Sequence, residues 1–140
     1  MSEHALWESL RGLLPPDCHA TRIESDVSPG FPDVHYSYKE VTGTIELKKS
    51  RKSPKSALPF SGKGQGLRKS QIDWIGAELY SGGLVWIIAQ VGRTIYVLDG
   101  QHADNFNKMT VHDLMRCSVT VWQSGAYPPG LLDKVLRNDW

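Results

Sequence analysis

The N-terminal segment has a helical spacing of apolar residues. Four leucines recur at three- and four-residue intervals and predict a helix over residues 3–14: Leu6, Leu10, Leu13 and Leu14. The Pro15-Pro16 pair ends this helix. Glu3 precedes Leu6 by three residues and so shares its inward-facing stripe, where a carboxylate is unusual unless it caps the helix dipole. Residues 19–25 alternate well enough to predict a strand.

Residues 33–48 alternate in polarity on both sides of a short turn, which predicts a β-hairpin with one apolar and one polar face. A four-residue turn pairs Asp33 with Lys48, whereas a two-residue turn at Lys39-Glu40 pairs Asp33 with Glu46. Either register gathers the same polar side chains on one face: Asp33, His35, Glu46 and Lys48.

The rest of the chain changes from helical to extended patterns. Residues 67–83 predict a helix that ends at Gly82-Gly83, and the apolar run 84–91 predicts a strand buried on both faces. A two-residue turn leads into an edge-like partner strand at 94–100. Past Gly100 the patterns predict three short elements: a helix opened by a capping box at 110–113, a strand at 118–122 and a helix at 131–137.

Together these elements predict a single α/β (α+β) domain, residues 1–140, around one mixed sheet. Its order is α-β-β-β-α-β-β over a core of residues 3–99, followed by a small appendage at 100–140. No apolar run approaches the roughly 20 residues of a membrane helix. The N-terminal sequence MSEHALWESL has no basic segment typical of a signal peptide. We therefore expect a cytoplasmic protein without a membrane partner.

Positive charge is concentrated in one segment. Eight of the 16 Lys and Arg lie between Lys48 and Lys69, and no Asp or Glu occurs between Glu46 and Asp73. The rest of the chain carries eight basic against 15 acidic residues. The glycines and prolines of residues 51–66 predict a flexible loop, which is either solvated surface or a seat for a polyphosphate such as nucleic acid. The candidate DNA contacts are Lys49, Arg51, Lys52, Lys55, Lys63, Arg68 and Lys69.

The polar face of the hairpin has the chemistry of a phosphodiesterase. Asp33 and Glu46 converge and repel each other unless a cation lies between them, and oxygen ligands suit Mg²⁺ or Mn²⁺. Lys48, two residues after Glu46 on the same face, can offset charge that develops on a phosphate. An exposed, solvated strand face is the alternative interpretation.

These residues carry a family resemblance. The PD…IELKK pattern with Gln71 downstream resembles the PD-(D/E)XK nuclease superfamily. Several motifs together are similar to phage-type members near the VRR-NUC and archaeal Holliday-junction-resolvase groups: Glu3, Leu6, Trp7 and Leu10 in the first helix, RIES, G.PDV, IELK, and Gln71 with Trp74. The resemblance covers about residues 3–99. The long insert at 51–66 departs from it.

The resemblance implies a restriction-endonuclease-like core, DNA hydrolysis dependent on Mg²⁺ (with Mn²⁺ able to substitute) and often a homodimer. It implies that Asp33 and Glu46, with the Leu47 carbonyl, hold the metal and that Lys48 is the catalytic lysine. Glu3 matches the first-helix acid that completes the site, and Gln71 the second-helix glutamine near the lysine.

The sequence therefore predicts a metal-dependent endonuclease selective for branched DNA such as four-way (Holliday) junctions, placed in the host cytoplasm if a phage encodes it. A nuclease or nickase without structural preference is one alternative. An inactive DNA-binding module of the same fold is another, and an RNA-directed nuclease is a third.

Overall fold

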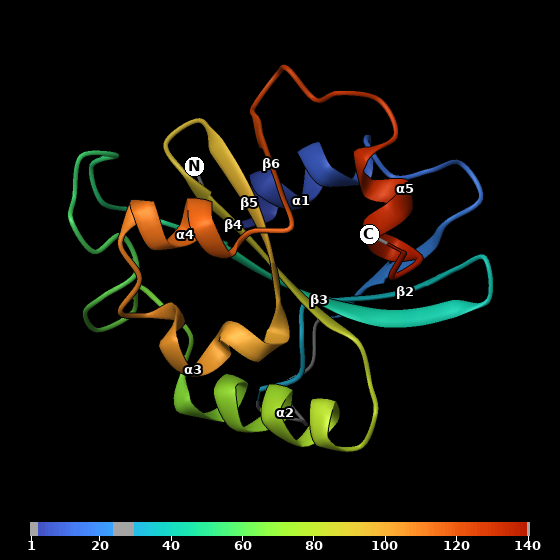
Figure 1. The fold of residues 1–140 in the computed structure, drawn as a ribbon, viewed down its shortest axis with the longest axis horizontal. Helices are drawn as coiled ribbons and strands as arrows, with labels where there is room; N and C mark the ends of the chain where they lie inside the picture. Colours follow the sequence, from blue (N-terminus) through green and yellow to red (C-terminus); the bar gives the residue numbers. More distant parts are fainter. Residues whose placement is uncertain (1–2, 24–29, 140) are drawn as a thin grey trace.

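One six-stranded mixed sheet forms the centre of the protein, seen in a computed structural model that describes residues 3–23 and 30–139 (Figure 1). The strands lie side by side in sequence order. All neighbours are antiparallel except β3 and β4, which are parallel. Their bounds are β1 His19–Arg22, β2 Val34–Tyr38, β3 Val41–Lys49, β4 Val85–Val91, β5 Thr94–Asp99 and β6 Thr120–Gln123.

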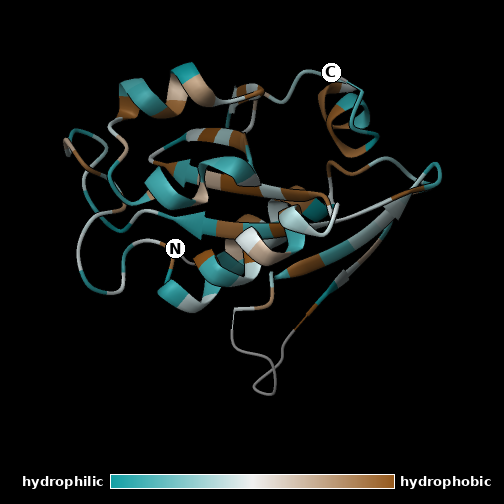
Figure 2. Ribbon diagram, turned by 60° about the horizontal axis from the view of Figure 1, so that its bottom comes forward, coloured by the Kyte–Doolittle hydropathy of each residue, from teal (hydrophilic) through white to brown (hydrophobic). Residues whose placement is uncertain are grey.

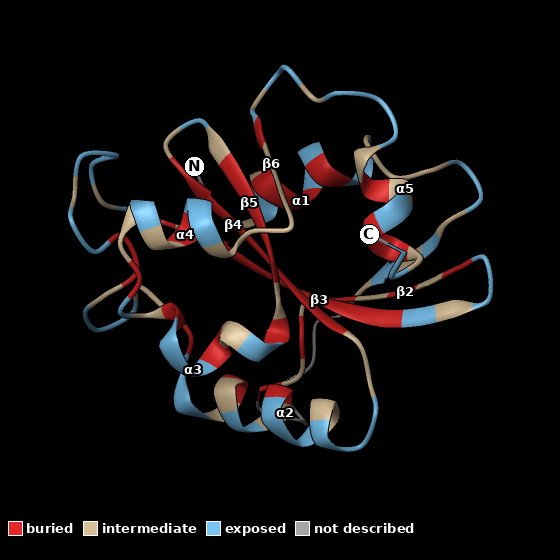
Figure 3. Cartoon of the chain, in the orientation of Figure 1, coloured by how far each residue is buried: buried red, intermediate tan, exposed pale blue. Residues whose placement is uncertain are grey.

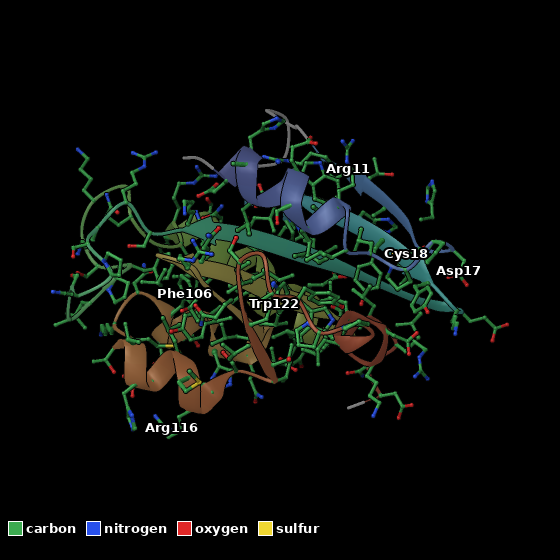
Figure 4. All side chains as sticks on the ribbon, turned by 90° about the horizontal axis from the view of Figure 1, so that it is seen from above. Arg11, Asp17, Cys18, Phe106, Arg116 and Trp122 are labelled. Atoms are coloured by element: carbon green, nitrogen blue, oxygen red, sulfur yellow. The ribbon has the colours of Figure 1, made fainter. Side chains whose placement is uncertain are left out.

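Helices cover both faces of this sheet, as the sequence predicts. Their bounds are α1 Glu3–Arg11, α2 Lys69–Tyr80, the 3₁₀ turn η1 Gly100–His102, α3 Ala103–Phe106, α4 Val111–Cys117 and α5 Leu131–Leu136. In Figure 4 the strands lie between α1 and α4, which carries Arg116. No helix among the described residues is long and apolar enough to cross a membrane.

Two apolar cores fill the spaces between the sheet and its helices. The first joins α1 and α5 to one face and includes Leu6, Tyr36, Leu47 and Trp86. The second joins α2, α3 and α4 to the other face and includes Phe60, Ile75 and Phe106. The strands are the most buried part of the chain and the most apolar, whereas exposed residues gather on loops and outer helix faces (Figures 2 and 3). Side chains of β3 alternate between the two cores, which determines where its polar residues point.

The hairpin adopts the tighter of the two predicted registers. Tyr38 pairs with Val41 and Val34 with Ile45, so Lys39 and Glu40 alone form the turn. Both have positive φ, 49° and 69°, which two-residue hairpin turns require for a matching twist. Continuing this register by one residue places Asp33 opposite Glu46.

Several predicted boundaries are wrong in detail. Helix α1 ends at Arg11 rather than at residue 14, because Leu14 precedes a proline and is disfavoured in a helix. Strand β1 ends at Arg22, so Ile23 is not part of it, and the last two residues of the predicted strand, Glu24 and Ser25, lie outside the described residues. Strand β5 is not at an edge, because β6 pairs along its outer side.

The C-terminal residues are built into the sheet rather than appended to it. Strand β6 extends the sheet, and α5 packs into the first core through Leu132, Val135 and Leu136. The predicted capping box is confirmed: Thr110 Oγ1 accepts from the Asp113 N–H, and Asp113 Oδ2 accepts from the Thr110 N–H, both at 3.0 Å.

The basic loop, residues 51–66, contains no helix or strand but is anchored to the second core. Phe60 is fully buried, and its ring packs 4.5 Å from that of Phe106. In Figure 1 this green segment lies beside α3 and α4. The sequence predicts a flexible loop here, and its composition does not reveal the aromatic anchor.

Candidate active site

Glu46 is a buried carboxylate in the middle of a central strand. It is 1% exposed and pairs with Ile87 on the parallel strand β4, while Lys48 pairs with Ala89. Ile87 and Ala89 belong to the second core, so Glu46 and Lys48 point to the face covered by α2 and α3. An exposed, solvated strand face is therefore excluded for these two residues. A charge so deeply placed must be neutralised by its neighbours or carry a proton.

Asp33 lies at the entrance to β2 and reaches across to β3. Its Oδ2 accepts a hydrogen bond from the Leu47 N–H at 2.8 Å. Its own carbonyl accepts from the Ile23 N–H at 2.6 Å, which ties the residue to the chain beyond β1. These bonds fix Asp33 beside Glu46, as the tighter of the two predicted registers requires.

The two carboxyl groups affect each other strongly. Burial, above all, raises the pKa of Glu46 to about 10, and the charge of Asp33 and a hydrogen bond to its carboxyl add to the rise. The nearby Lys48 ammonium lowers the pKa of Glu46, whereas the charge of Glu3 raises it slightly. Two neighbouring carboxyl groups are stable when a proton or a cation lies between them.

Gln71 holds the Glu46 carboxylate from the opposite side. Its Nε2 donates to both carboxylate oxygens at 3.2 Å, and its Oε1 accepts from the Arg68 N–H at 2.8 Å. Gln71 is 5% exposed and is the third residue of α2, whose N-cap is Arg68.

The structure brings Glu3 and Lys48 to the same place. Lys48 is 8% exposed on the Glu46 face of β3, and Glu3, at the start of α1, is near enough for its charge to act on Glu46. Four predicted catalytic residues therefore lie together, Asp33, Glu46, Lys48 and Gln71, and the charge of the fifth, Glu3, reaches Glu46. Their catalytic and metal-binding roles stay predictions.

The oxygen donors around Glu46 suit a hard divalent cation. Asp33 and Glu46 offer carboxylates and Leu47 a backbone carbonyl, the ligand types that Mg²⁺ and Mn²⁺ favour. Within residues 3–23 and 30–139, no three His, Cys, Asp or Glu are grouped so that they could hold one metal ion. The fit therefore rests on Asp33, Glu46 and the Leu47 carbonyl, and Glu3 as a fourth ligand stays a prediction.

The seven residues predicted to contact DNA differ in their exposure and in their bonds to other residues. The Lys52 Nζ donates to the Leu58 carbonyl at 2.9 Å and to Ser61 Oγ at 2.7 Å, so it braces the loop from within. Lys69 forms an ion pair with Asp73 at 2.9 Å, and burial lowers the pKa of Lys49. Four exposed side chains make no ion pair in the described part of the chain: Arg51, Lys55, Lys63 and Arg68.

Sequence reasoning missed two supports of the site. One is the bond from the Leu47 N–H to Asp33, which needs the register that the sequence left open. The other is Asn107, whose amide binds the backbone of Leu67. Asn107 lies in a largely polar stretch, residues 101–108, where nothing in the sequence singles it out.

No protein-family model matches the sequence, and no curated protein matches it. The structure is similar to the 1.6 Å structure of Archaeoglobus fulgidus Hjc, a Holliday junction resolvase from an archaeal hyperthermophile, with a TM-score of 0.53 and 18% sequence identity. The match covers 81% of this chain and 88% of that one. At this identity the likeness is one of fold: a mixed sheet flanked by helices, in the restriction-endonuclease-like arrangement.

Proposed function

We propose that this chain is a Mg²⁺-dependent endodeoxyribonuclease of the PD-(D/E)XK type that hydrolyses phosphodiester bonds in branched DNA such as four-way junctions. One observation carries the proposal: a buried Glu46 beside Asp33, with Lys48 on the same strand face and a glutamine bound to both carboxylate oxygens. A purely structural strand has no need for this costly arrangement. The fold likeness to Hjc agrees with it.

Each residue has a distinct role in the proposed reaction. Asp33, Glu46 and the Leu47 carbonyl would hold Mg²⁺, which neutralises phosphoryl charge and makes water nucleophilic at neutral pH. The Lys48 ammonium offers positive charge and hydrogen-bond donors where negative charge develops on the phosphate. Gln71 keeps the Glu46 carboxylate oriented. The resemblance implies products with a 5′-phosphate and a 3′-hydroxyl.

The basic loop would bind the DNA backbone beside these residues. The loop begins two residues after Lys49, the last residue of β3, and ends three residues before α2, whose third residue is Gln71, so both ends of the loop lie close to the site in sequence. Its exposed cations would gain affinity by displacing counterions from phosphates. A four-way junction has two-fold symmetry, which a two-fold homodimer matches best, so we propose that the protein acts as a homodimer.

The test compares cleavage of an end-labelled four-way junction with cleavage of a linear duplex of the same sequence. Each substrate is incubated with Mg²⁺ and with EDTA, beside the Glu46→Gln variant. We expect Mg²⁺-dependent nicks in the junction that are absent in the variant. A single-stranded RNA of matching sequence tests the RNA-directed alternative.

The other outcomes separate the alternatives. Equal cleavage of duplex and junction would retain the nuclease and remove the junction preference. Tight binding without any cleavage would identify a DNA-binding module and reject the enzyme.

A further inference from the structure

A side-chain amide from the C-terminal part of the chain holds the end of the basic loop. The Leu67 N–H donates to Asn107 Oδ1 at 2.7 Å, and Asn107 Nδ2 donates to the Leu67 carbonyl at 2.8 Å. Leu67 is itself 4% exposed, so its two backbone groups depend on Asn107 for these bonds. One amide thus fixes a whole residue of backbone from 40 positions away.

Asn107 is itself held firmly. It follows Phe106, which is fully buried against the ring of Phe60. On the loop side, Gly66 leaves the space that the amide occupies, because a Cβ there would overlap Asn107 Oδ1. The loop is therefore fastened twice to the α3 segment, by an aromatic contact at residue 60 and by the amide at residue 67.

The bonded backbone leads directly into the site. The residue after Leu67 is Arg68, whose N–H donates to Gln71 Oε1 at 2.8 Å. This bond determines which way the Gln71 amide faces, because an amide that accepts through its oxygen presents its Nε2 on the other side. The Gln71 Nε2 then reaches both oxygens of Glu46. An unbroken series of hydrogen bonds and one peptide unit joins Asn107 to the central carboxylate.

We propose that Asn107 is a positioning residue for the reaction: by fixing the backbone at Leu67 and Arg68 it orients Gln71, and through Gln71 the Glu46 carboxylate. This inference rests on the proposed function. It gives residues 100–109 a role in the chemistry as well as in the sheet. Two possible roles of Asn107 can be told apart. A residue that only anchors the loop would change DNA binding, whereas a residue that positions Gln71 would change turnover.

The primary variant is Asn107→Ala in the full chain, with Asn105→Ala as the matched control. Asn105 lies two residues earlier on α3, and its side chain is exposed. In the DNA-free protein we expect the Arg68 amide to exchange with solvent about fivefold to tenfold faster in Asn107→Ala, as loss of a supporting hydrogen bond implies. The Gln71 side-chain amide resonances should move toward those of a free amide. The control variant Asn105→Ala should change neither the Arg68 exchange rate nor the Gln71 resonances.

The kinetic measurement uses junction DNA at saturating Mg²⁺. We expect kcat to fall about tenfold in Asn107→Ala with KM for DNA unchanged, the low end of the effect typical of residues that orient ligands. A raised KM with unchanged kcat would show that Asn107 only anchors the loop, and it would overturn the proposal. A wild-type rate of hydrogen exchange at the Arg68 amide in Asn107→Ala would also overturn the proposal.

Two further variants guard against misfolding of the first. Asn107→Asp keeps the acceptor for the Leu67 N–H and loses the donor, so its effects should be intermediate. In Gly66→Ala the new Cβ would overlap both the Asn107 amide and the Phe60 carbonyl, so this variant displaces the amide together with the loop backbone and should slow turnover as Asn107→Ala does. Wild-type kcat and Arg68 exchange in both would reject the positioning role. If the wild-type protein cleaves no DNA, the proposed function fails, and the Arg68 and Gln71 resonances still decide whether Asn107 orients Gln71.

Discussion

The side-chain amide of Gln71 donates to both oxygens of Glu46, at 3.2 Å each, from the first turn of a helix onto the central strand of the sheet. A carboxylate bonded symmetrically in this way has its free lone pairs directed away from the helix. The bond also joins the two ends of the chain segment that contains the basic loop. The geometry of the site therefore depends on a side chain from the first turn of α2.

Replacing Gln71 should slow cleavage while the fold persists. Gln71→Ala leaves Glu46 without its donor, and we expect a loss of activity of about 10- to 100-fold, typical of residues that orient a metal ligand. Single-turnover cleavage at saturating Mg²⁺ measures this. Gln101→Ala, at an exposed position in η1, is the matched control. Equal rates in the two variants would mean that Glu46 needs no partner.

Replacing Lys48 should abolish cleavage and leave junction binding largely intact. Lys48 is buried near Glu46, where we propose that its positive charge would stabilise negative charge developing on the phosphate. We expect Lys48→Ala to bind junction DNA within a few-fold of wild type in Ca²⁺, measured by gel shift, and to give no product in Mg²⁺. Lys134→Ala, exposed on α5, controls for the loss of one charge. An active Lys48→Ala would refute its catalytic assignment.

Two lysines of the basic loop should behave differently towards salt. Lys55 is exposed, and Lys55→Ala should flatten the plot of log affinity against log salt concentration by about one unit of slope, the effect of one lost phosphate contact. Lys52 braces Leu58 and Ser61, so Lys52→Ala should change the slope less and speed proteolysis within residues 52–61. Binding titrations from 50 to 200 mM salt, roughly the usual range, test this. Identical slopes would remove the distinction.

The buried Tyr36 should make the fold sensitive to alkali. Burial raises the pKa of Tyr36 to about 12, from 10.0. Above pH 10 the unfolded chain therefore loses its phenol proton while the folded chain keeps it, so the free energy of unfolding falls as pH rises towards 12. Urea unfolding at pH 9 and 11, about one unit either side of the ordinary value, measures the fall.

Tyr36→Phe should reduce that alkaline loss. It should also be less stable at pH 9, because the Tyr36 hydroxyl bonds the Leu136 carbonyl and accepts from Trp86 Nε1. Tyr80→Phe, 94% exposed, is the control and should keep the wild-type dependence on pH. The same alkaline slope in Tyr36→Phe as in wild type would assign the effect to other groups.

The alternation of polar and apolar residues predicted which side chains share a face of the hairpin, because that alternation does not depend on the length of the turn. Glu46 and Lys48 face together in either register, and the structure confirms their shared face. The sequence left two turns open, because Lys39 and Glu40 are not residues that favour positive φ. Local periodicity also cannot say which strands pair, so the inner position of β5 was missed.

Contacts between distant residues were the other omission. The Phe60–Phe106 packing and the Asn107–Leu67 bonds join segments that are about 40 residues apart, with no shared periodicity to connect them. A hydrogen bond between a side-chain amide and a distant backbone group leaves no local pattern in the sequence. Such supports are visible only once the sheet has brought the segments together.

The sequential order of the strands has a consequence for how the protein folds. Two of the five strand junctions are two-residue turns, at Lys39-Glu40 and at Gly92-Arg93. The parallel β3–β4 junction closes over residues 50–84, the longest connection in the sheet. Closure of a longer connection costs more chain entropy, and non-local pairing slows folding. We therefore expect the two hairpins to form early and the β3–β4 joint, which brings Gln71 to Glu46, to form late, so that partly folded chains lack the assembled site.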